Sequence, residues 1–248
     1  PEYARDTFTG YEAFPRLPDH GIDVARAIEV IGSRRPSIVV LTSPNNPTGT
    51  ALPAPDLRAI ASAALAVGAM VIVDEAYAEF RHDGVPSACE LLDEYPNLVV
   101  TRTMSKAFSL AGARLGYAVA ADPRVVDALR VVRLPYHLSA VTQAVALTAL
   151  QYADDLQAQV ALLRIERDAL AAWLVERGFD VAASDANFIL FGTFDDRSAV
   201  WQSLLDDGVL VRETGPPGWL RVSIGTPEEN AMFRRALDGA TRPTREED

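Results

Sequence analysis

Short apolar runs that alternate with a helical pattern constrain the fold of this chain more than any other feature. Residues 37–42 are Ser-Ile-Val-Val-Leu-Thr, residues 70–74 are Met-Val-Ile-Val-Asp, and the alanine-rich stretch 54–67 lies between them. Continuous β-branched runs are typical of strands buried on both faces of a parallel sheet. Further runs at 97–102 and 116–121 continue the pattern. The sequence therefore predicts an α/β fold with a mostly parallel sheet and flanking helices.

The second half of the chain has a different pattern, in which helices dominate and strands are short. Its expected helices cover 125–133, about 140–177, about 198–207 and 227–237, and its expected strands cover 187–191, 209–212 and 220–224. This mixture predicts a smaller C-terminal α+β domain.

These patterns divide the chain into two domains and a tail. We expect a large domain over 1–145 and a small domain over 146–240, with a long helix that spans the boundary. The polar residues 241–248 are expected to fray. Because the chain starts abruptly and without methionine, we expect the large domain to lack an N-terminal part.

The composition excludes several classes of function. The net charge of −11, without a basic run, argues against a nucleic-acid partner. The single cysteine, Cys89, excludes an internal disulfide, and the three histidines lack metal-ligand spacing, so we expect no metal site. No apolar run approaches the length that a membrane span needs, and no leader is evident, so the sequence predicts a cytoplasmic protein.

The basic residues are unusual, because Lys106 is the only lysine among 23 lysines and arginines. A compositional bias toward arginine would explain this. A functional need for one amine would explain it too, since arginine cannot be deprotonated to a nucleophile whereas lysine can. Composition alone leaves both explanations open.

Polar motifs follow three successive predicted strands. Ser-Pro-Asn-Asn-Pro-Thr-Gly occupies 43–49, Asp-Glu-Ala-Tyr occupies 74–77 and Thr-Met-Ser-Lys occupies 103–106. Each motif alone has an ordinary structural explanation, such as a turn or a helix cap. Functional groups in an open parallel sheet gather beyond the carboxyl ends of the strands. We therefore expect these side chains to share one crevice.

The chemistry of this set indicates a pyridoxal-phosphate site. The amine of Lys106 can form a Schiff base with a carbonyl cofactor, and the carboxylate of Asp74 can keep a pyridine nitrogen protonated. Phenol or amide donors can hold the ring oxygen, while hydroxyls and an arginine can hold the phosphate.

The same motifs resemble those of a known family. Residues 43–50, 71–77, 103–117 and 220–225 are similar to motifs of fold-type-I pyridoxal-phosphate aminotransferases, in the same order, and most similar to those of histidinol-phosphate aminotransferases. The resemblance implies that fold, the cofactor pyridoxal 5'-phosphate, and a homodimer.

The resemblance also implies roles for individual residues. Lys106 would be the Schiff-base lysine and proton shuttle, and Asp74 the partner of the pyridinium. The remaining cofactor contacts would be made by Asn46 and Tyr77 at the ring oxygen and by Thr103, Ser105 and Arg114 at the phosphate.

The resemblance assigns substrate recognition to three other residues. Arg221 matches an arginine that grips a substrate or glutamate carboxylate, and Arg212 matches one that helps to bind the substrate phosphate. Both could instead be exposed arginines on a hairpin. Asn187 begins a motif that faces the site in relatives, although an asparagine turn before a buried strand is an equal explanation. Tyr136 and His137 are weaker candidates at the mouth of the site.

Relatives carry three features before the point where this chain begins. These are an arm that packs on the partner subunit, a glycine-containing loop whose helix N-terminus meets the cofactor phosphate, and a tyrosine lent across the dimer interface. Because helix N-termini are strong phosphate sites, we expect their loss to weaken cofactor binding.

The predicted function is transamination of L-histidinol phosphate with 2-oxoglutarate, a step of histidine biosynthesis. Within the same fold, an aromatic amino acid aminotransferase and a threonine-phosphate decarboxylase remain alternatives. From another class, a cofactor-binding sensor domain of a transcription regulator remains open. A folded fragment that makes dimer contacts without activity is a further alternative.

Overall fold

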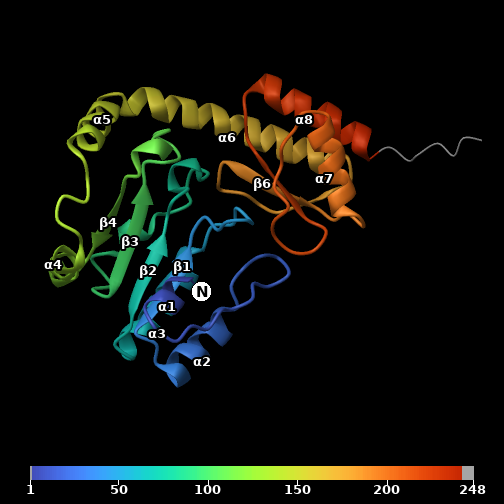
Figure 1. Ribbon diagram of the computed structural model, residues 1–248. Helices are drawn as coiled ribbons and strands as arrows, with labels where there is room; N and C mark the ends of the chain where they lie inside the picture. Colours follow the sequence, from blue (N-terminus) through green and yellow to red (C-terminus); the bar gives the residue numbers. More distant parts are fainter. Residues whose placement is uncertain (1, 242–248) are drawn as a thin grey trace, which may run out of the picture.

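Two β-sheets organise residues 2–241, which are the residues that this computed structural model describes (Figure 1). The large sheet has the order β1-β2-β3-β4, with β1 at Ile38–Thr42, β2 at Met70–Asp74, β3 at Leu98–Thr103 and β4 at Gly116–Ala120. The small sheet has the order β5-β6-β7, with β5 at Asp180–Val181, β6 at Phe188–Gly192 and β7 at Leu220–Ser223. The predicted α/β class with a C-terminal α+β part is confirmed.

The register of the large sheet brings three strand ends to one edge. β1, β2 and β3 are parallel, and Thr42 lies opposite Asp74, which in turn lies opposite Thr101. β4 runs antiparallel to β3 and starts with Gly116 opposite Thr103. The polar motifs that follow the first three strands, and the loop that enters β4, therefore lie at the same edge.

Eight α-helices and three short 3₁₀ helices complete the described residues. The helices are α1 Glu2–Asp6, α2 Val24–Arg34, α3 Ala54–Ala66, α4 Pro123–Val132, α5 Ala140–Gln151, α6 Ala153–Glu176, α7 Arg197–Asp206 and α8 Pro227–Ala240, with η1 Ala78–Phe80, η2 Ala88–Leu91 and η3 Ala111–Ala113. The sequence patterns missed α2, although Asp23 marks its start by accepting a hydrogen bond from the amide of Arg26 at 2.9 Å. No helix among these residues is long and apolar enough to cross a bilayer.

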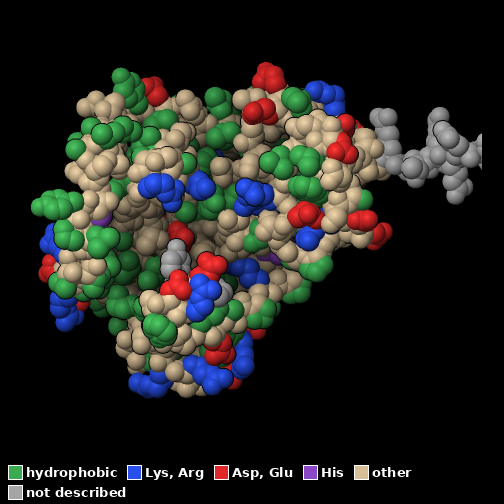
Figure 2. Space-filling model, in the orientation of Figure 1, with side chains coloured by type: hydrophobic (Ala, Val, Ile, Leu, Met, Phe, Trp, Pro, Cys, Tyr) green, Lys and Arg blue, Asp and Glu red, His purple; other side chains and the backbone are tan. Residues whose placement is uncertain are grey.

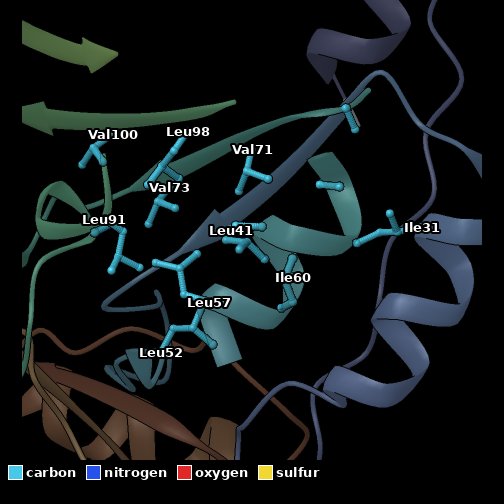
Figure 3. Packing of buried hydrophobic residues seen from close by; sticks show 14 residues of the cluster. Ile31, Leu41, Leu52, Leu57, Ile60, Val71, Val73, Leu91, Leu98 and Val100 are labelled. Carbon is cyan, nitrogen blue, oxygen red and sulfur yellow. The ribbon is translucent and has the colours of Figure 1, made fainter. Parts of the chain in front are cut away.

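The core of the large part lies between the sheet and α3. Leu57 and Ile60 of α3 point toward Val71 and Val73 of β2 in Figure 3, and all four side chains are buried. Burial of one such side chain is worth about 1.5–3 kcal/mol. This packing fixes β2, and hence the position of the residues that follow it.

The prediction that the strands of the large sheet are buried on both faces is wrong for β1. Successive residues of a strand point to opposite faces, and Val39 and Leu41 pack into the core. Ile38 and Val40 on the other face are 54% and 65% exposed. Among residues 2–241, α3 and its neighbours cover β1 on one side only.

The long helix expected over about 140–177 is also wrong, because the structure has two helices there. Tyr152 separates α5 from α6 with φ −107° and ψ 24°, which lie outside the helical range. Asp154 and Asp155 occupy the first turn of α6, where acidic side chains favour a helix start. The predicted domain boundary at residue 145 lies inside α5 and stays a prediction.

The small sheet packs against α6, α7 and α8 (Figure 1). Phe191 of β6 lies at the centre of this core, with the rings of Phe194 and Phe233 at 5.7 and 5.6 Å between centroids. The strand predicted at 209–212 is wrong, because only Arg212 forms a bridge there, to Arg221. The glycine- and proline-rich turn at 215–218 ends the pairing. Of the predicted polar tail, 242–248 lie outside the described residues.

Candidate functional site

The site begins at the edge where the parallel strands end. Asp74 is the last residue of β2, and Tyr77 follows it by three residues. Lys106 lies in the loop after β3 with an exposed side chain, and its Nζ is 5.4 Å from the centroid of the Tyr77 ring. The structure therefore brings the amine and the phenol together, as the motifs predict, at the strand end that carries the carboxylate.

The conformation of Asp74 is fixed locally. Its Oδ1 accepts a hydrogen bond from the backbone N–H of Ala76 at 3.1 Å. The next residue, Glu75, is 1% exposed and is held by Arg102 at 2.6 Å and by the amide of Ala88 at 2.7 Å. A buried carboxylate that is paired and hydrogen-bonded in this way strongly resists displacement. Glu75 therefore anchors the chain directly after the carboxylate of the site.

Two hydroxyls and a guanidinium lie beside the lysine loop. The Thr103 hydroxyl donates to the Ser105 hydroxyl at 3.0 Å and accepts from the Ser105 amide at 3.1 Å. Met104 N donates to Leu115 O at 3.0 Å, which extends the β3–β4 pairing by one residue and brings the segment that follows Arg114 next to the lysine loop. Arg114 is exposed, with φ 52°, and donates to Ala111 O at 3.0 Å. This cluster has the donors that a phosphate requires.

Asn46 extends from the loop after β1 toward the small sheet. Its Oδ1 accepts a hydrogen bond from Nη1 of Arg221 at 2.5 Å, between residues 175 positions apart in the chain. The loop is shaped by Gly49, whose φ of +81° favours glycine and whose carbonyl accepts from the Asp185 amide at 2.8 Å. Both contacts tie the large sheet to the small one at the site.

Arg221 of β7 is connected to the site by the ring of Phe188, which lies between Arg221 and Tyr77. Its Cζ lies 4.7 Å from the ring centroid of Phe188, and that ring meets the edge of Tyr77 at 5.0 Å. Burial lowers the pKa of the guanidinium and the nearby charge of Arg212 lowers it further, although the phenol of Tyr77 opposes this. The buried Nε of Arg221 has no hydrogen-bond partner within the described residues. The guanidinium therefore retains a free donor.

Of the remaining candidates, some lie next to Arg221 and others lie away from the cluster. Arg212 pairs with Arg221 through two backbone hydrogen bonds of 2.9 Å and has an exposed side chain. No carboxylate of residues 2–241 forms an ion pair with either arginine. Asn187 directly precedes β6, and its carbonyl accepts from the Ile224 amide at 2.9 Å. Tyr136 is 98% exposed, and the ring of His137 forms its hydrogen bonds with Arg133 among residues 2–241, so the structure does not bring these two into the cluster.

Sequence reasoning missed one buried charge close to the site. Arg167 of α6 is 1% exposed and donates to the carbonyls of Phe80 and Ala186. It occupies a position in the apolar stripe of the helix, four residues after Leu163 and three before Leu170. Its Nε also pairs with Oδ1 of Asp168 at 2.9 Å. An arginine within such a stripe is the signal that could have identified it, because charged side chains are rarely buried.

The surface agrees with this arrangement. On the face drawn in Figure 2, a row of basic side chains crosses the middle, and acidic side chains lie directly below it. Arg114, Arg212 and Arg221 come from both parts. Although the chain as a whole is acidic, both of its parts therefore contribute positive charge to the site.

Sequence comparison finds close relatives. The chain is 63% identical over 241 residues to the histidinol-phosphate aminotransferase of Thermobifida fusca, which covers 97% of the chain and 65% of that protein. It is 56% identical over 236 residues to histidinol-phosphate aminotransferase 3 of Burkholderia lata, which covers 95% and 63%. The chain thus spans slightly less than two thirds of the length of these relatives.

Structural comparison agrees. A putative histidinol-phosphate aminotransferase from Erwinia carotovora atroseptica matches with a TM-score of 0.85 and 28% identity, over 96% of this chain and 69% of that chain. The Sinorhizobium meliloti histidinol-phosphate aminotransferase in complex with pyridoxal-5'-phosphate also has a TM-score of 0.85, with 26% identity over 96% and 66%. This likeness confirms the predicted fold, that of fold-type-I pyridoxal-phosphate-dependent transferases.

The family follows from a match over almost the whole chain. The model of the family described as "Aminotransferase class I and II" matches residues 7–237. This range includes both sheets and every residue of the cluster. The chain belongs to the class I and II aminotransferases.

Proposed function

We propose that the protein is a pyridoxal-phosphate-dependent aminotransferase that transfers the amino group of L-histidinol phosphate to 2-oxoglutarate. The observation that carries the proposal is the position of Lys106, whose amine lies against Tyr77 at the strand end that carries Asp74. The names of the two relatives described above favour this amino donor over an aromatic amino acid.

The residues present fit the cofactor by their chemistry. A pyridoxal phosphate offers a carbonyl, a ring nitrogen, a ring oxygen and a phosphate, and the cluster has an amine, a carboxylate, an amide with a phenol, and hydroxyls with a guanidinium. The orphaned Nε of Arg221 adds a buried donor at the same place. Each group of the cofactor therefore has a partner of matching polarity.

When bound, pyridoxal phosphate supplies a carbonyl that takes up an amine and a ring that withdraws electrons from it. Lys106 would bind that carbonyl through Nζ and would move a proton at Nζ. Asp74 would hold the proton of the ring nitrogen. Asn46 and Tyr77 orient the ring.

Three further residues bind the phosphate of the cofactor. Thr103 and Ser105 present hydroxyls from the end of β3, and Arg114 presents a guanidinium from the adjacent loop. Charge-assisted hydrogen bonds to phosphate are about twice as strong as neutral ones. These residues would therefore hold the phosphate beside the loop that carries Lys106.

Three residues of the small part contribute to the choice of substrate. We assign carboxylate binding to Arg221, because a planar guanidinium matches a carboxylate in bidentate geometry. Arg212 lies beside it and is assigned to the phosphate of the amino donor. Asn187, at the start of β6, faces the same crevice in this proposal.

The proposal includes a homodimer and a cytoplasmic location. The exposed Ile38 and Val40 of β1 and the exposed Leu147 and Leu150 of α5 form apolar surface that further protein would cover. Analytical ultracentrifugation of the natural full-length protein tests the dimer, and sedimentation as a monomer at micromolar concentration would contradict it.

The decisive assay uses the natural full-length protein with histidinol phosphate and 2-oxoglutarate and measures glutamate. Glutamate that accumulates in proportion to enzyme supports the proposal. Faster turnover with phenylalanine or tyrosine would assign an aromatic donor instead. Carbon dioxide released from threonine phosphate would assign a decarboxylase. Cofactor binding without any turnover would favour a sensor domain.

A second experiment tests the role of Lys106. Borohydride reduction followed by peptide mass spectrometry is expected to label Lys106 within this chain, because it has no other lysine side chain. Lys106→Ala is expected to abolish both the label and the cofactor absorbance band. Lys106→Arg is the matched control, since it keeps the charge but cannot form a Schiff base. Turnover that survives in Lys106→Ala would overturn the proposal.

A further inference from the structure

We propose that Arg167 is a positioning residue, which holds the loop that carries Tyr77 and the strand that carries Phe188 at a fixed separation. The inference rests on the proposed function, because it concerns the spacing of Lys106 and Tyr77 from the arginine that receives the substrate. Arg167 itself lies away from the reacting atoms, in the middle of α6.

The guanidinium of Arg167 joins three segments of the chain. Its Nη1 donates to the carbonyl of Phe80 at 2.6 Å and to the carbonyl of Ala186 at 3.2 Å. Phe80 ends the short helix after Tyr77, and Ala186 lies two residues before Phe188. The residue is 1% exposed, so both carbonyls would lose their partner in a dry environment if the side chain were removed.

A second connection runs beside the first through His82. Nη2 of Arg167 lies 2.8 Å from Nε2 of His82, and Nδ1 of His82 lies 2.8 Å from Oδ1 of Asp185. Asp168 also belongs to this connection, because its Oδ1 accepts a hydrogen bond from Nε of Arg167 at 2.9 Å and lies 3.1 Å from Nε2 of His82. The His82 amide also donates to Asp185 at 2.9 Å. Two connections therefore hold the loop after β2 next to the segment before β6. One runs through Arg167 and the other runs through His82.

The helix that carries Arg167 also supports the lysine loop. Val160 of α6 is buried against Phe80 and Ala107, and Ala107 directly follows Lys106. The two turns of helix between Val160 and Arg167 thus contact the loops that carry both residues at the centre of the site. No other charged side chain of the described residues is as deeply buried, apart from Glu75.

This arrangement sets the geometry that the reaction needs. The rings of Tyr77 and Phe188 meet edge to face with 5.0 Å between their centroids. The Cζ of Arg221 lies 4.7 Å from the centroid of the Phe188 ring. A displacement of Phe188 relative to Tyr77 moves Arg221 relative to the amine. The separation held by Arg167 therefore governs whether one substrate can contact Arg221 and Lys106 at the same time, and a change in this separation is expected to weaken substrate binding.

The test compares four variants of the natural full-length protein loaded with cofactor, of which Arg167→Lys is the conservative one. Arg167→Met keeps much of the volume but removes every donor. Arg164→Met is the matched control, because Arg164 lies one turn earlier on α6 and binds Asp83, which is 97% exposed and outside this connection. His82→Phe breaks only the second connection and leaves the buried charge with its carbonyls.

Two readouts are expected to change together. Arg167→Met is expected to raise KM for histidinol phosphate at least tenfold with a smaller change in kcat, and His82→Phe to raise it about threefold. Hydrogen exchange of amides 76–82 and 184–189 is expected to accelerate at least tenfold in Arg167→Met. Arg164→Met is expected to change neither readout, and Arg167→Lys to restore part of the loss, because one ammonium can reach both carbonyls.

A merely structural role gives a different result. If Arg167→Met lowers only the folded fraction, kcat falls while KM stays constant, and the proposal is overturned. Exchange that accelerates in one segment alone also overturns it. If the unmodified protein shows no turnover with histidinol phosphate, the proposed function fails, and the exchange measurement still decides whether Arg167 couples the two segments.

Discussion

The approach of Gly49 to Ser184 provides a quantitative test of how the large and small parts meet. A Cβ added at Gly49 would lie 2.3 Å from the Ser184 hydroxyl oxygen, 2.7 Å from its Cβ and 3.0 Å from its Cα. Atoms cannot approach this closely without displacement. Gly49→Ala is therefore expected to push apart the loop that carries Asn46 and the segment that leads into β6.

The magnitude follows from two contributions. A non-glycine residue at φ +81° costs about 1–2 kcal/mol. Displacement of Ser184 also weakens its hydrogen bond to Phe188 O at 2.6 Å and the one it accepts from Ala186 N at 3.2 Å, each worth about 1 kcal/mol. The expected loss in free energy of unfolding is therefore about 3–4 kcal/mol.

Gly68 offers a matched control for the backbone contribution. It has φ +79° at the end of α3, and a Cβ there would meet no atom within 4 Å. Gly68→Ala is expected to cost about 1–2 kcal/mol through its backbone alone. Effects of the substitution on the unfolded chain are the same at both positions and cancel in the comparison.

Urea unfolding of both variants measures the difference. The expected gap between them is about 2 kcal/mol, which exceeds the uncertainty of a comparison by midpoints at equal slope. A second measurement, cofactor binding followed by absorbance, is expected to weaken in Gly49→Ala alone. Equal losses in the two variants would refute the reasoning, since they would show that the contact with Ser184 carries no energy.

Three further changes test the small part and the N-terminal segment. Phe191→Ala, between three other aromatic rings, is expected to cost about 3–5 kcal/mol in urea unfolding, and a loss below 1 kcal/mol would contradict the described core. Asn230→Ala is expected to cost about 2–3 kcal/mol, because the buried amide bridges Glu166 and both backbone groups of Gly225, whereas exposed Gln202→Ala should be nearly neutral. Burial, with the charge of Arg16, lowers the pKa of His20, so the unfolded chain binds its proton more tightly. The stability linked to His20 is then complete above about pH 6.5 and is lost as the pH falls through the lowered pKa, and His20→Gln should flatten this part of the curve of Tm against pH.

The sequence predicted the half of the site that lies on the large sheet. Periodicity located β1, β2 and β3, and parallel strands necessarily deliver their carboxyl ends to one edge. The proximity of Lys106, Asp74 and Tyr77 follows from those two facts alone. No long-range information was needed, because the residues that matter follow the strands directly.

The other half depended on contacts that no local pattern contains. The hydrogen bond between Asn46 and Arg221 joins residues 175 positions apart, and nothing near either residue specifies it. The break at Tyr152 was missed because alanine and leucine favour a continuous helix, whereas acidic residues after it favour a new start. The exposed face of β1 was missed because a fully apolar strand has the same sequence whether one face or both are covered.

The helix α6 connects the two sheets mechanically, because it packs against the loops of the large sheet and against the core of the small sheet. It has 24 residues, and about 14 Å of helix separates Arg167 from its end at Glu176, given a rise of about 1.5 Å per residue. A tilt of about 4° at Arg167 thus moves that end by about 1 Å. Leu170 and Leu174, which lie on this arm, are packed into the core beneath β6 and β7. A change in the angle of this helix is therefore expected to change the distance between Arg221 and Lys106, even when the substitution that causes it lies far from the crevice.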